Sequence, residues 1–406
     1  MRSEISGRFK RWFWRPPRAH GEIIADRQVS VLELFYDLVY VAVIGQASHH
    51  LATHVSLRGV AEFTVVFSLI WIAWINGSLY LELHGRGDGR TRSIVFLQMG
   101  VLVLLAVFTA EAAGASGWGF AVVYATYQVV QTWLWYSVWR QDRRDHSEFL
   151  RLAGGYVAGM AVSAALILAS ASLPATPRLL VWAGLGVAWL VGIGLAARRS
   201  RVGLGLTPTD SLVERFGLFT IIVLGEVVLG VVAGLSATER DAKTIVTGML
   251  ALWMGFGFWW IYFDLVGGRL PRADRATLAN WVISHLPITL AITATGAGMV
   301  SLIGHAHDAH TPAGTSWLLA GALATGLLAL VRIEQALVDA ERLSVVFHPL
   351  RLALAGGAGA ALLVGWLRPA PWLLALLLVG ILCAVWSFAV SRFLRADAWG
   401  THDRED

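Results

Sequence analysis

The sequence is poor in charged residues and nearly devoid of cysteine. Asp, Glu, Lys and Arg make up 15% of the 406 residues, whereas hydrophobic residues make up 56%. A soluble protein carries about 25% charged residues, so a soluble globular fold is excluded. The single cysteine, Cys383, excludes a disulfide framework and metal sites built from several cysteines. Residues 1–28 lack an apolar core long enough for a cleavable signal peptide.

Motifs of well-understood chemistry are missing as well. The sequence has no GxxxxGK[ST] loop, which argues against ATP-driven transport. It has no HExxH pair and no nucleophile elbow, so protease and hydrolase chemistry lack their usual residues. We therefore expect no cofactor and no catalytic residue. The chain is more easily understood as a non-enzyme, although an intramembrane enzyme remains an alternative.

Long hydrophobic runs fill most of the chain. Spanning a bilayer needs roughly 20 mostly apolar residues, and twelve stretches have about this length. The sequence thus predicts an all-α, polytopic membrane helix bundle of about 12 transmembrane helices, with the lipid bilayer as its main partner. The stretches are 31–54, 59–83, 92–112, 117–139, 150–171, 178–196, 211–235, 242–265, 277–303, 316–338, 347–367 and 371–393.

Basic residues indicate how these helices are oriented. Most of the 32 Lys and Arg residues fall before the first stretch, after the last one and in alternate connections. Cytoplasmic loops are the ones enriched in basic residues, so we expect both termini to be cytoplasmic. Anionic lipid of the cytoplasmic leaflet attracts such basic residues, which accounts for the net charge of +5 without a nucleic-acid partner. The remaining loops hold only Arg58, Arg178, Arg240, Lys243 and Arg368.

One stretch occurs twice. Residues 32–46 read LELFYDLVYVAVIGQ, and residues 213–226 read VERFGLFTIIVLGE. The ends of the following stretches also match, Tyr80 with Tyr262, at a nearly constant offset of about 180 residues. An even number of spans in each half inserts both halves in the same orientation, as parallel repeats do.

The repeat divides the chain into two parallel six-helix halves. We expect a cytoplasmic basic and aromatic segment at 1–28, a first transmembrane repeat at 29–200 and a second at 201–396. A polar cytoplasmic tail follows at 397–406. The segment Arg8-Phe9-Lys10-Arg11-Trp12-Phe13-Trp14-Arg15 is typical of an anchor lying on the inner leaflet.

The run Leu32-Glu33-Leu34-Phe35-Tyr36-Asp37-Leu38-Val39-Tyr40 resembles the signature of the low temperature requirement protein A family of bacterial membrane proteins. Gln46-Ala47-Ser48-His49, Glu214-Arg215-Phe216-Gly217 with Gly225-Glu226, and His285-Leu286-Pro287 are similar to further elements of that family. The resemblance implies a polytopic inner-membrane protein linked by name to growth in the cold. It implies no particular reaction or substrate. Val227 departs from the small polar residue expected after Glu226.

Ionisable residues within membrane helices are costly and mark functional sites by default. Glu33 and Asp37 lie one turn apart on the first helix, and Gln46 lies on a second polar face. Two interpretations stay open for the acids at the cytoplasmic end: a salt-bridge network neutralised by Arg215, or a vestibule that attracts cations. The residues at this level are Glu33, Asp37, Glu82, Glu214, Arg215 and Asp264.

Glu226 is the sharper candidate, because it lies near or beyond mid-membrane with no basic residue close by in sequence. Isolation in a low dielectric disfavours the charged form of a carboxyl group, so Glu226 is suited to exchange a proton or to ligate a small cation. The alternative is a structural hydrogen bond to a neighbouring helix. His285 precedes Pro287 by two residues, and it either satisfies polar groups at the kink or relays protons with Glu226 or Asp37.

Three histidines in one outer loop, His305, His307 and His310, are weak candidates for a metal site. Loop spacing alone is a loose filter, and no carboxylate–histidine motif accompanies them. Whether the protein binds a metal is left open by the sequence.

The leading hypothesis is a secondary transporter or ion pathway for protons or small cations, using buried carboxylates on the two repeated helices. A cation channel is one alternative, because Phe35-Tyr36-Asp37 is distantly similar to a signature of lysosomal and bacterial potassium channels. The second half has no matching aspartate. A non-transporting protein of membrane or lipid homeostasis and an intramembrane enzyme are the others. The sequence does not indicate the oligomeric state.

Overall fold

A computed structural model describes residue 13 and residues 15–22, 27–200 and 202–396. Most of the predicted interfacial segment and the predicted polar tail at 397–406 lie outside the described residues. The described chain is helical almost throughout, with one isolated β-bridge between Pro271 and Leu337.

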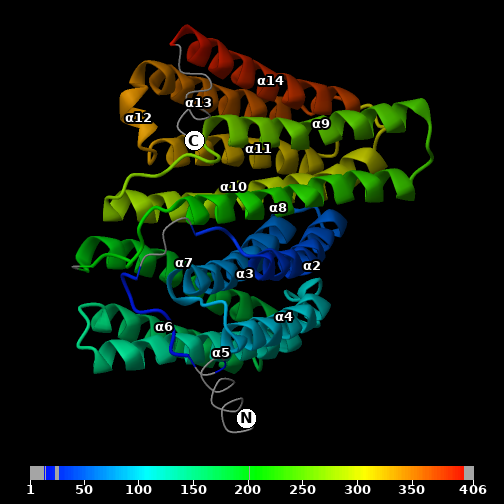
Figure 1. The fold of residues 1–406 in the computed structure, drawn as a ribbon. Coiled ribbons are helices and arrows are strands. Elements are labelled where there is room, and N and C mark those ends of the chain that lie inside the picture. The colour runs from blue at the N-terminus through cyan, green and yellow to red at the C-terminus, as the bar shows by residue number, and fades with distance from the viewer. Residues whose placement is uncertain (1–12, 14, 23–26, 201, 397–406) are drawn as a thin grey trace, which may run out of the picture. The chain divides into compact units, whose positions relative to one another are not determined.

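All twelve predicted stretches form helices, so the all-α fold is confirmed (Figure 1). A four-residue helix that the sequence does not predict, α12 (Asp339–Arg342), precedes α13. The twelve long helices are α2 (Val31–Thr53), α3 (Leu57–His84), α4 (Gly89–Thr109), α5 (Gly117–Arg144), α6 (Leu150–Ser170), α7 (Ala175–Arg199), α8 (Asp210–Ala237), α9 (Ala242–Leu265), α10 (Arg275–Gly304), α11 (Ala313–Glu334), α13 (Ser344–Leu367) and α14 (Pro371–Arg395).

Eleven helices among the described residues are long and apolar enough to cross a membrane, and together they make a polytopic membrane bundle. The long helix that does not meet this criterion is α5, which has 28 residues. Several of its polar side chains are buried, Tyr127, Gln128 and Gln131 among them, whereas Thr126 and Tyr136 are exposed. The low apolarity of α5 therefore reflects a polar interior in this part of the protein.

The chain divides into two compact units. Unit 1 comprises residues 1–47 and 65–212, and unit 2 comprises residues 48–64 and 213–406. The last turns of α2 and the start of α3 thus belong with the second half of the chain. The predicted boundary between two six-helix repeats at residue 200 remains a prediction.

Unit 1 is organised around α5. This helix packs against α4 and α6, and α6 packs in turn against α7. The Tyr124 hydroxyl of α5 donates to the Leu69 carbonyl of α3 at 2.8 Å. On α2, the Tyr40 hydroxyl lies 2.9 Å from that of Tyr127 on α5.

In unit 2 the helices pack in sequence around a common core. α9 packs against α10, α10 against α11, α11 against α13 and α13 against α14, and α14 returns to α9. Figure 1 shows these helices as long rods lying side by side. α8 lies against both α9 and α10. A Cβ added to Gly255 of α9 would meet α8, and a Cβ added to Gly230 of α8 would meet α10.

Local signals explain where several helices begin. Asp88, Asp241 and Asp274 precede α4, α9 and α10, and each accepts a hydrogen bond from a threonine N–H three residues on. Such N-caps satisfy backbone donors that have no partner within the helix. Proline stands at the start of α14, where its missing N–H costs nothing.

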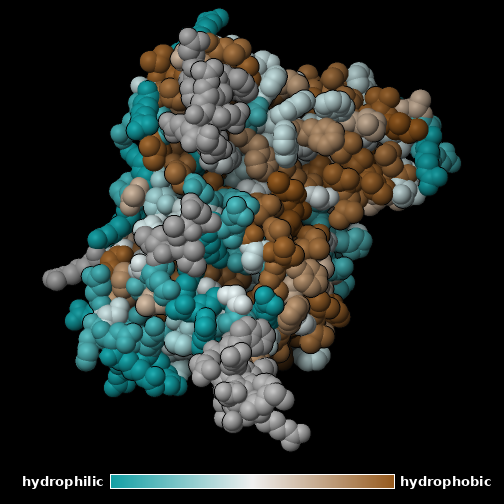
Figure 2. Space-filling model, in the orientation of Figure 1, coloured by the Kyte–Doolittle hydropathy of each residue, from teal (hydrophilic) through white to brown (hydrophobic). Residues whose placement is uncertain are grey.

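Large apolar side chains are exposed along the helices, as the bilayer requires. On the face drawn in Figure 2, hydrophobic residues cover broad areas and hydrophilic residues gather towards helix ends. Exposed examples include Leu104, Val107, Leu180 and Leu363. Because a soluble monomer rarely exposes large contiguous apolar patches, this surface suits contact with lipid.

Candidate functional site

Glu226 of α8 is buried within unit 2, with 4% of its surface exposed. It hydrogen-bonds to Ser48, which lies in the last turns of α2 and belongs to the same unit. One of its carboxylate oxygens, Oε1, has no hydrogen-bond partner among the described residues. The glutamate therefore has one hydroxyl partner in a low-dielectric setting. Its second oxygen, Oε1, is left to bind a proton or a cation.

A close, parallel contact between α8 and α10 positions this carboxylate. Near the start of both helices, the Phe216 ring lies 4.6 Å from the His285 ring. Further along, a Cβ on Gly296 would lie 2.7 Å from the backbone oxygen of Glu226. Glycine lets two helix backbones approach this closely. The backbone at Glu226 is thus fixed against α10.

Polar residues follow one face of α10 along this contact. His285, Thr289 and Gly296 lie within about 40° of one another at 100° per residue, and Thr293 is one turn beyond Thr289. All three polar side chains are buried. The Thr289 and Thr293 hydroxyls donate to the His285 and Thr289 carbonyls at 2.7 and 2.9 Å. A hydroxyl that donates in this way keeps its lone pairs for an incoming donor or cation.

His285 has a partner at each ring nitrogen. Nδ1 lies 2.8 Å from the Trp281 carbonyl oxygen, and Nε2 lies 3.2 Å from the Tyr262 hydroxyl. A carbonyl oxygen only accepts, so the proton is on Nδ1, and Nε2 accepts from Tyr262. These contacts fit a neutral histidine that satisfies polar groups before Pro287, one of the two interpretations drawn from the sequence.

Two of the predicted inner-end acids are joined by an arginine that the sequence interpretation missed. Arg27 Nη2 lies 3.0 Å from both oxygens of Glu33, and Arg27 Nη1 donates to Glu82. The Ser211 and Thr209 hydroxyls donate to the other oxygen of Glu82, at 2.7 and 3.0 Å. Glu33 and Glu82 thus share one arginine in unit 1. This arrangement favours the salt-bridge interpretation for these two residues, with Arg27 as the cation where the sequence interpretation named Arg215.

Asp37 is fully buried and accepts a hydrogen bond from the Trp74 indole at 2.9 Å. One residue before it, Tyr36 begins a cluster of phenols with Tyr40 and Tyr127, which Gln131 extends by donating to Tyr127 at 2.8 Å. This polar interior of unit 1 explains why α5 carries so many polar residues.

The remaining candidates differ in their surroundings. Arg215 is fully buried, whereas Glu214 and Gln46 are exposed. The second polar face of the first helix is therefore exposed at Gln46. Asp264 is partly buried and accepts the Trp386 indole N–H at 2.6 Å, across the contact between α9 and α14.

The three loop histidines have separate partners. His307 Nε2 lies 2.6 Å from Asp241, His305 Nδ1 lies 2.7 Å from the Ser301 carbonyl oxygen, and His310 Nδ1 lies 3.3 Å from the Arg368 carbonyl oxygen. The described residues contain no group of three or more His, Cys, Asp or Glu side chains placed to hold a metal ion. A backbone hydrogen bond from Thr244 lowers the pKa of Asp241.

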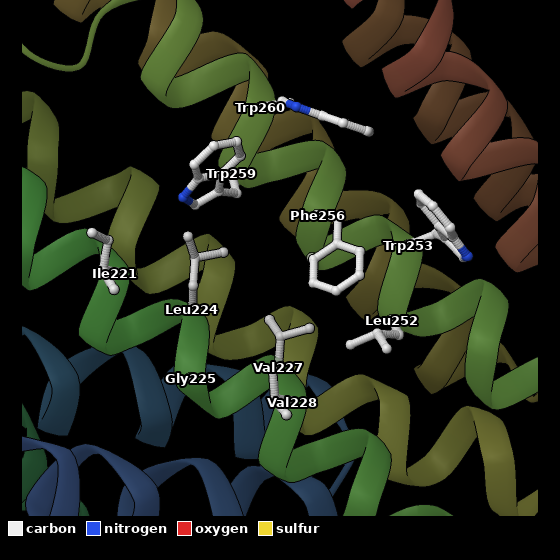
Figure 3. Close-up of a pocket in the computed structure, with 11 residues that line it drawn as sticks. Ile221, Leu224, Gly225, Val227, Val228, Leu252, Trp253, Phe256, Trp259 and Trp260 are labelled. Carbon is white, nitrogen blue, oxygen red and sulfur yellow. The ribbon is translucent and has the colours of Figure 1, made fainter.

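An apolar groove of about 550 Å³ lies beside this site, between α8 and α9 (Figure 3). Trp253, Phe256, Trp259 and Trp260 line it from α9, and all four are exposed. Glu226 is absent from its lining. The groove is thus a bilayer-facing surface, and the carboxylate lies on another side of α8.

Three polar residues take part in contacts that the sequence did not predict, although Ser48 lies in the run Gln46-Ala47-Ser48-His49 that resembles the family. Ser48 lies far from Glu226 in the chain, and Arg27 lies outside the apolar run. The third, Glu334, is 1% exposed and forms a two-pronged ion pair with Arg351, at 2.7 and 2.9 Å. Only the folded chain brings such partners together.

The helical fold, its apolar surface and its buried polar groups define a multi-pass membrane protein. The model of the bacterial low temperature requirement A protein family, LtrA, matches residues 28–388, and the chain belongs to this family. An uncharacterized protein of Rhizobium meliloti (strain 1021) is 27% identical over 302 residues, which cover 70% of this chain and 72% of the relative. No solved structure matches.

Proposed function

We propose that this protein is a secondary transporter or ion pathway of the bacterial inner membrane, in which Glu226 exchanges a proton or a small cation. The observation that carries the proposal is the state of Glu226: buried, hydrogen-bonded to Ser48, and with Oε1 unpartnered among the described residues. An ionisable group left half satisfied at membrane depth is expensive, and it points to function.

A second buried carboxylate in the same unit shows how a structural glutamate differs from Glu226. Glu334 is equally buried, but both of its oxygens accept from Arg351. Such a pair serves structure, because it leaves no site for another cation. Glu226 has no comparable partner among the described residues, which leaves its unpartnered oxygen to a transported ion.

The polar face of α10 supplies a path towards Glu226. His285 and Gly296 are eleven residues apart, or about 16 Å along the helix, and Thr289 and Thr293 lie between them. The buried hydroxyls offer oxygen lone pairs at intervals of one turn. In the predicted orientation, this path runs from the cytoplasmic half of the membrane to the level of Glu226.

Purified protein in liposomes tests the proposal. A gradient of H⁺, Na⁺ or K⁺ is imposed, and ion movement is followed with an ion-sensitive dye. We expect flux of at least one of these ions by the wild type, and no flux above empty liposomes for Glu226→Gln. Uptake of tracer ion against its own gradient, driven by unlabelled ion on the other side of the membrane, would identify a transporter rather than a channel.

Glu239→Gln is the matched control, because Glu239 follows α8 directly and is exposed. It undergoes the same chemical change away from the site and should retain the wild-type flux. Size-exclusion chromatography and circular dichroism establish that each variant is folded. The proposal fails if folded wild-type protein carries none of the three ions, or if Glu226→Gln carries as much as the wild type.

A further inference from the structure

A groove of about 1110 Å³ lies in unit 1 between α6 and α7. Its two ends differ in chemistry. Ser147, Glu148, Arg151, Arg199 and Ser200 line one end, whereas Val162, Leu185 and Ile193 line the other part. Its volume is slightly above the range of about 300–1,000 Å³ found for small-molecule pockets, so it is large enough for a lipid chain.

Glycines keep this groove open. A Cβ added to Gly155 of α6 or to Gly192 of α7 would have no neighbour within 4 Å, and one on Gly159 would meet only the Trp189 ring, at 3.8 Å or more. This differs from the α8–α10 contact, where glycines allow two backbones to touch. The glycines between α6 and α7 therefore widen a space instead of closing one.

The length of the groove matches one leaflet. Its lining on α6 extends from Leu150 to Ser163, which is about 20 Å along a helix. Half of a hydrocarbon core of about 30 Å is about 15 Å. A ligand that fills this groove has a polar end at the membrane surface and an apolar part that reaches mid-membrane.

The polar end is suited to a phosphate group. Arg151 and Arg199 are exposed, and neither forms a hydrogen bond or ion pair within the described part of the chain. The first turn of α6 lies there too, and its N-cap residue, Phe149, supplies no side-chain cap, so backbone N–H groups add to the positive potential. Glu148 is the single acid in the lining, which leaves a net charge of +1.

We propose that this groove binds one anionic glycerophospholipid of the cytoplasmic leaflet. Arg151 and Arg199 hold its phosphate, and an acyl chain lies along Gly155, Gly159 and Gly192. Basic pockets between membrane helices on the cytoplasmic side bind anionic headgroups in this way. The inference is independent of whether Glu226 exchanges ions.

Native mass spectrometry of the full-length protein, titrated with phosphatidylglycerol or with phosphatidylcholine, tests this site. We expect one phosphatidylglycerol to bind more tightly than phosphatidylcholine. The variant Arg151→Gln/Arg199→Gln should weaken phosphatidylglycerol binding by about thirtyfold, because each basic residue near the surface contributes about fivefold. Gly192→Leu should abolish binding by filling the groove, and the open space there predicts that the variant folds.

Two matched controls isolate the site. Arg144→Gln/Arg198→Gln removes the same charge from exposed residues that do not line the groove, and Gly184→Leu adds the same side chain at another open position of α7. Both should bind phosphatidylglycerol as the wild type does. The proposal is overturned if phosphatidylcholine binds as tightly as phosphatidylglycerol. It is also overturned if a control variant loses as much phosphatidylglycerol binding as the groove variant to which it is matched.

Discussion

At the scale of single residues, two buried glutamates of unit 2 have opposite surroundings. Glu334 accepts two hydrogen bonds from Arg351, whereas Glu226 has a serine partner and an unpartnered oxygen. The sequence singled out Glu226 because no base lies near it along the chain. It did not single out Glu334, whose arginine lies 17 positions away on another helix. Burial alone thus does not distinguish a site from a structural pair.

This difference predicts opposite effects on stability. Glu334→Gln leaves Arg351 without its carboxylate, and breaking a buried pair costs about 3–5 kcal/mol. Because Arg351 is partly exposed, we expect about 3 kcal/mol or less. Glu226→Gln replaces a half-satisfied carboxyl with an amide of the same shape and should change stability by less than Glu334→Gln.

The free energy of unfolding in mixed detergent micelles, measured for both variants, checks this prediction. A larger loss for Glu226→Gln than for Glu334→Gln would mean that Glu226 is a structural residue and would weaken the transport proposal.

The cap of α10 gives a pH-dependent prediction outside the membrane spans. Hydrogen bonds from the Thr277 side chain and backbone lower the pKa of Asp274. A carboxyl whose pKa is lowered on folding stabilises the protein above its unfolded-state pKa, and this contribution is lost as pH falls through the folded-state pKa. Asp274→Ala should therefore lower stability at neutral pH, by about 1 kcal/mol or less at this exposed site.

Unfolding midpoints of wild type and Asp274→Ala, compared from neutral to acidic pH, should converge in acid. Asp274→Asn serves as the control, since asparagine caps without a charge, and its difference from Asp274→Ala should not depend on pH. A gap between wild type and Asp274→Ala that widens in acid would contradict the assignment.

At the scale of helices, the positions of the twelve long elements could be predicted from apolar runs alone. The packing partners could not, because apolar side chains facing lipid and apolar side chains facing protein look the same in sequence. α5 has a face of each kind: Gln128 and Gln131 are buried against protein, whereas Val129 and Trp133 are exposed. The pairing of Ser48 with Glu226 depends on how α2 and α8 fold, and no spacing reveals it.

The α8–α10 contact yields a prediction at this scale. Gly296→Ala places a Cβ 2.7 Å from the Glu226 backbone oxygen, which belongs to a helix and cannot move aside. Overpacking of this kind costs about 1–3 kcal/mol, so the variant should unfold at a lower temperature and lose ion flux through the displaced Glu226.

Gly225→Ala is the matched control, because a Cβ there meets nothing within 4 Å. Alanine is favoured over glycine in a helix by about 1 kcal/mol, so this variant should be as stable as the wild type or more so. Both variants are compared by their unfolding temperatures in detergent. Equal temperatures for Gly296→Ala and Gly225→Ala would contradict the close contact between α8 and α10.

At the scale of the whole molecule, the chain is a multi-pass member of the LtrA family with two compact units. The repeated run places Asp37 in unit 1 and Glu226 in unit 2, and both side chains are buried. Asp37 accepts from an indole, and Glu226 from a hydroxyl. The sequence similarity of the two runs was visible without a structure, but the different partners of these carboxylates became visible only in the fold.

The central claim, that Glu226 exchanges a proton or cation, is tested most directly by chemical labelling. Dicyclohexylcarbodiimide modifies protonated carboxyl groups in apolar surroundings, and mass spectrometry of peptides locates the adduct. We predict labelling at Glu226 that falls as pH rises or as the transported cation is added, with little labelling of the ion-paired Glu334. An unlabelled Glu226 in folded protein, or labelling that neither pH nor H⁺, Na⁺ or K⁺ alters, would contradict the account.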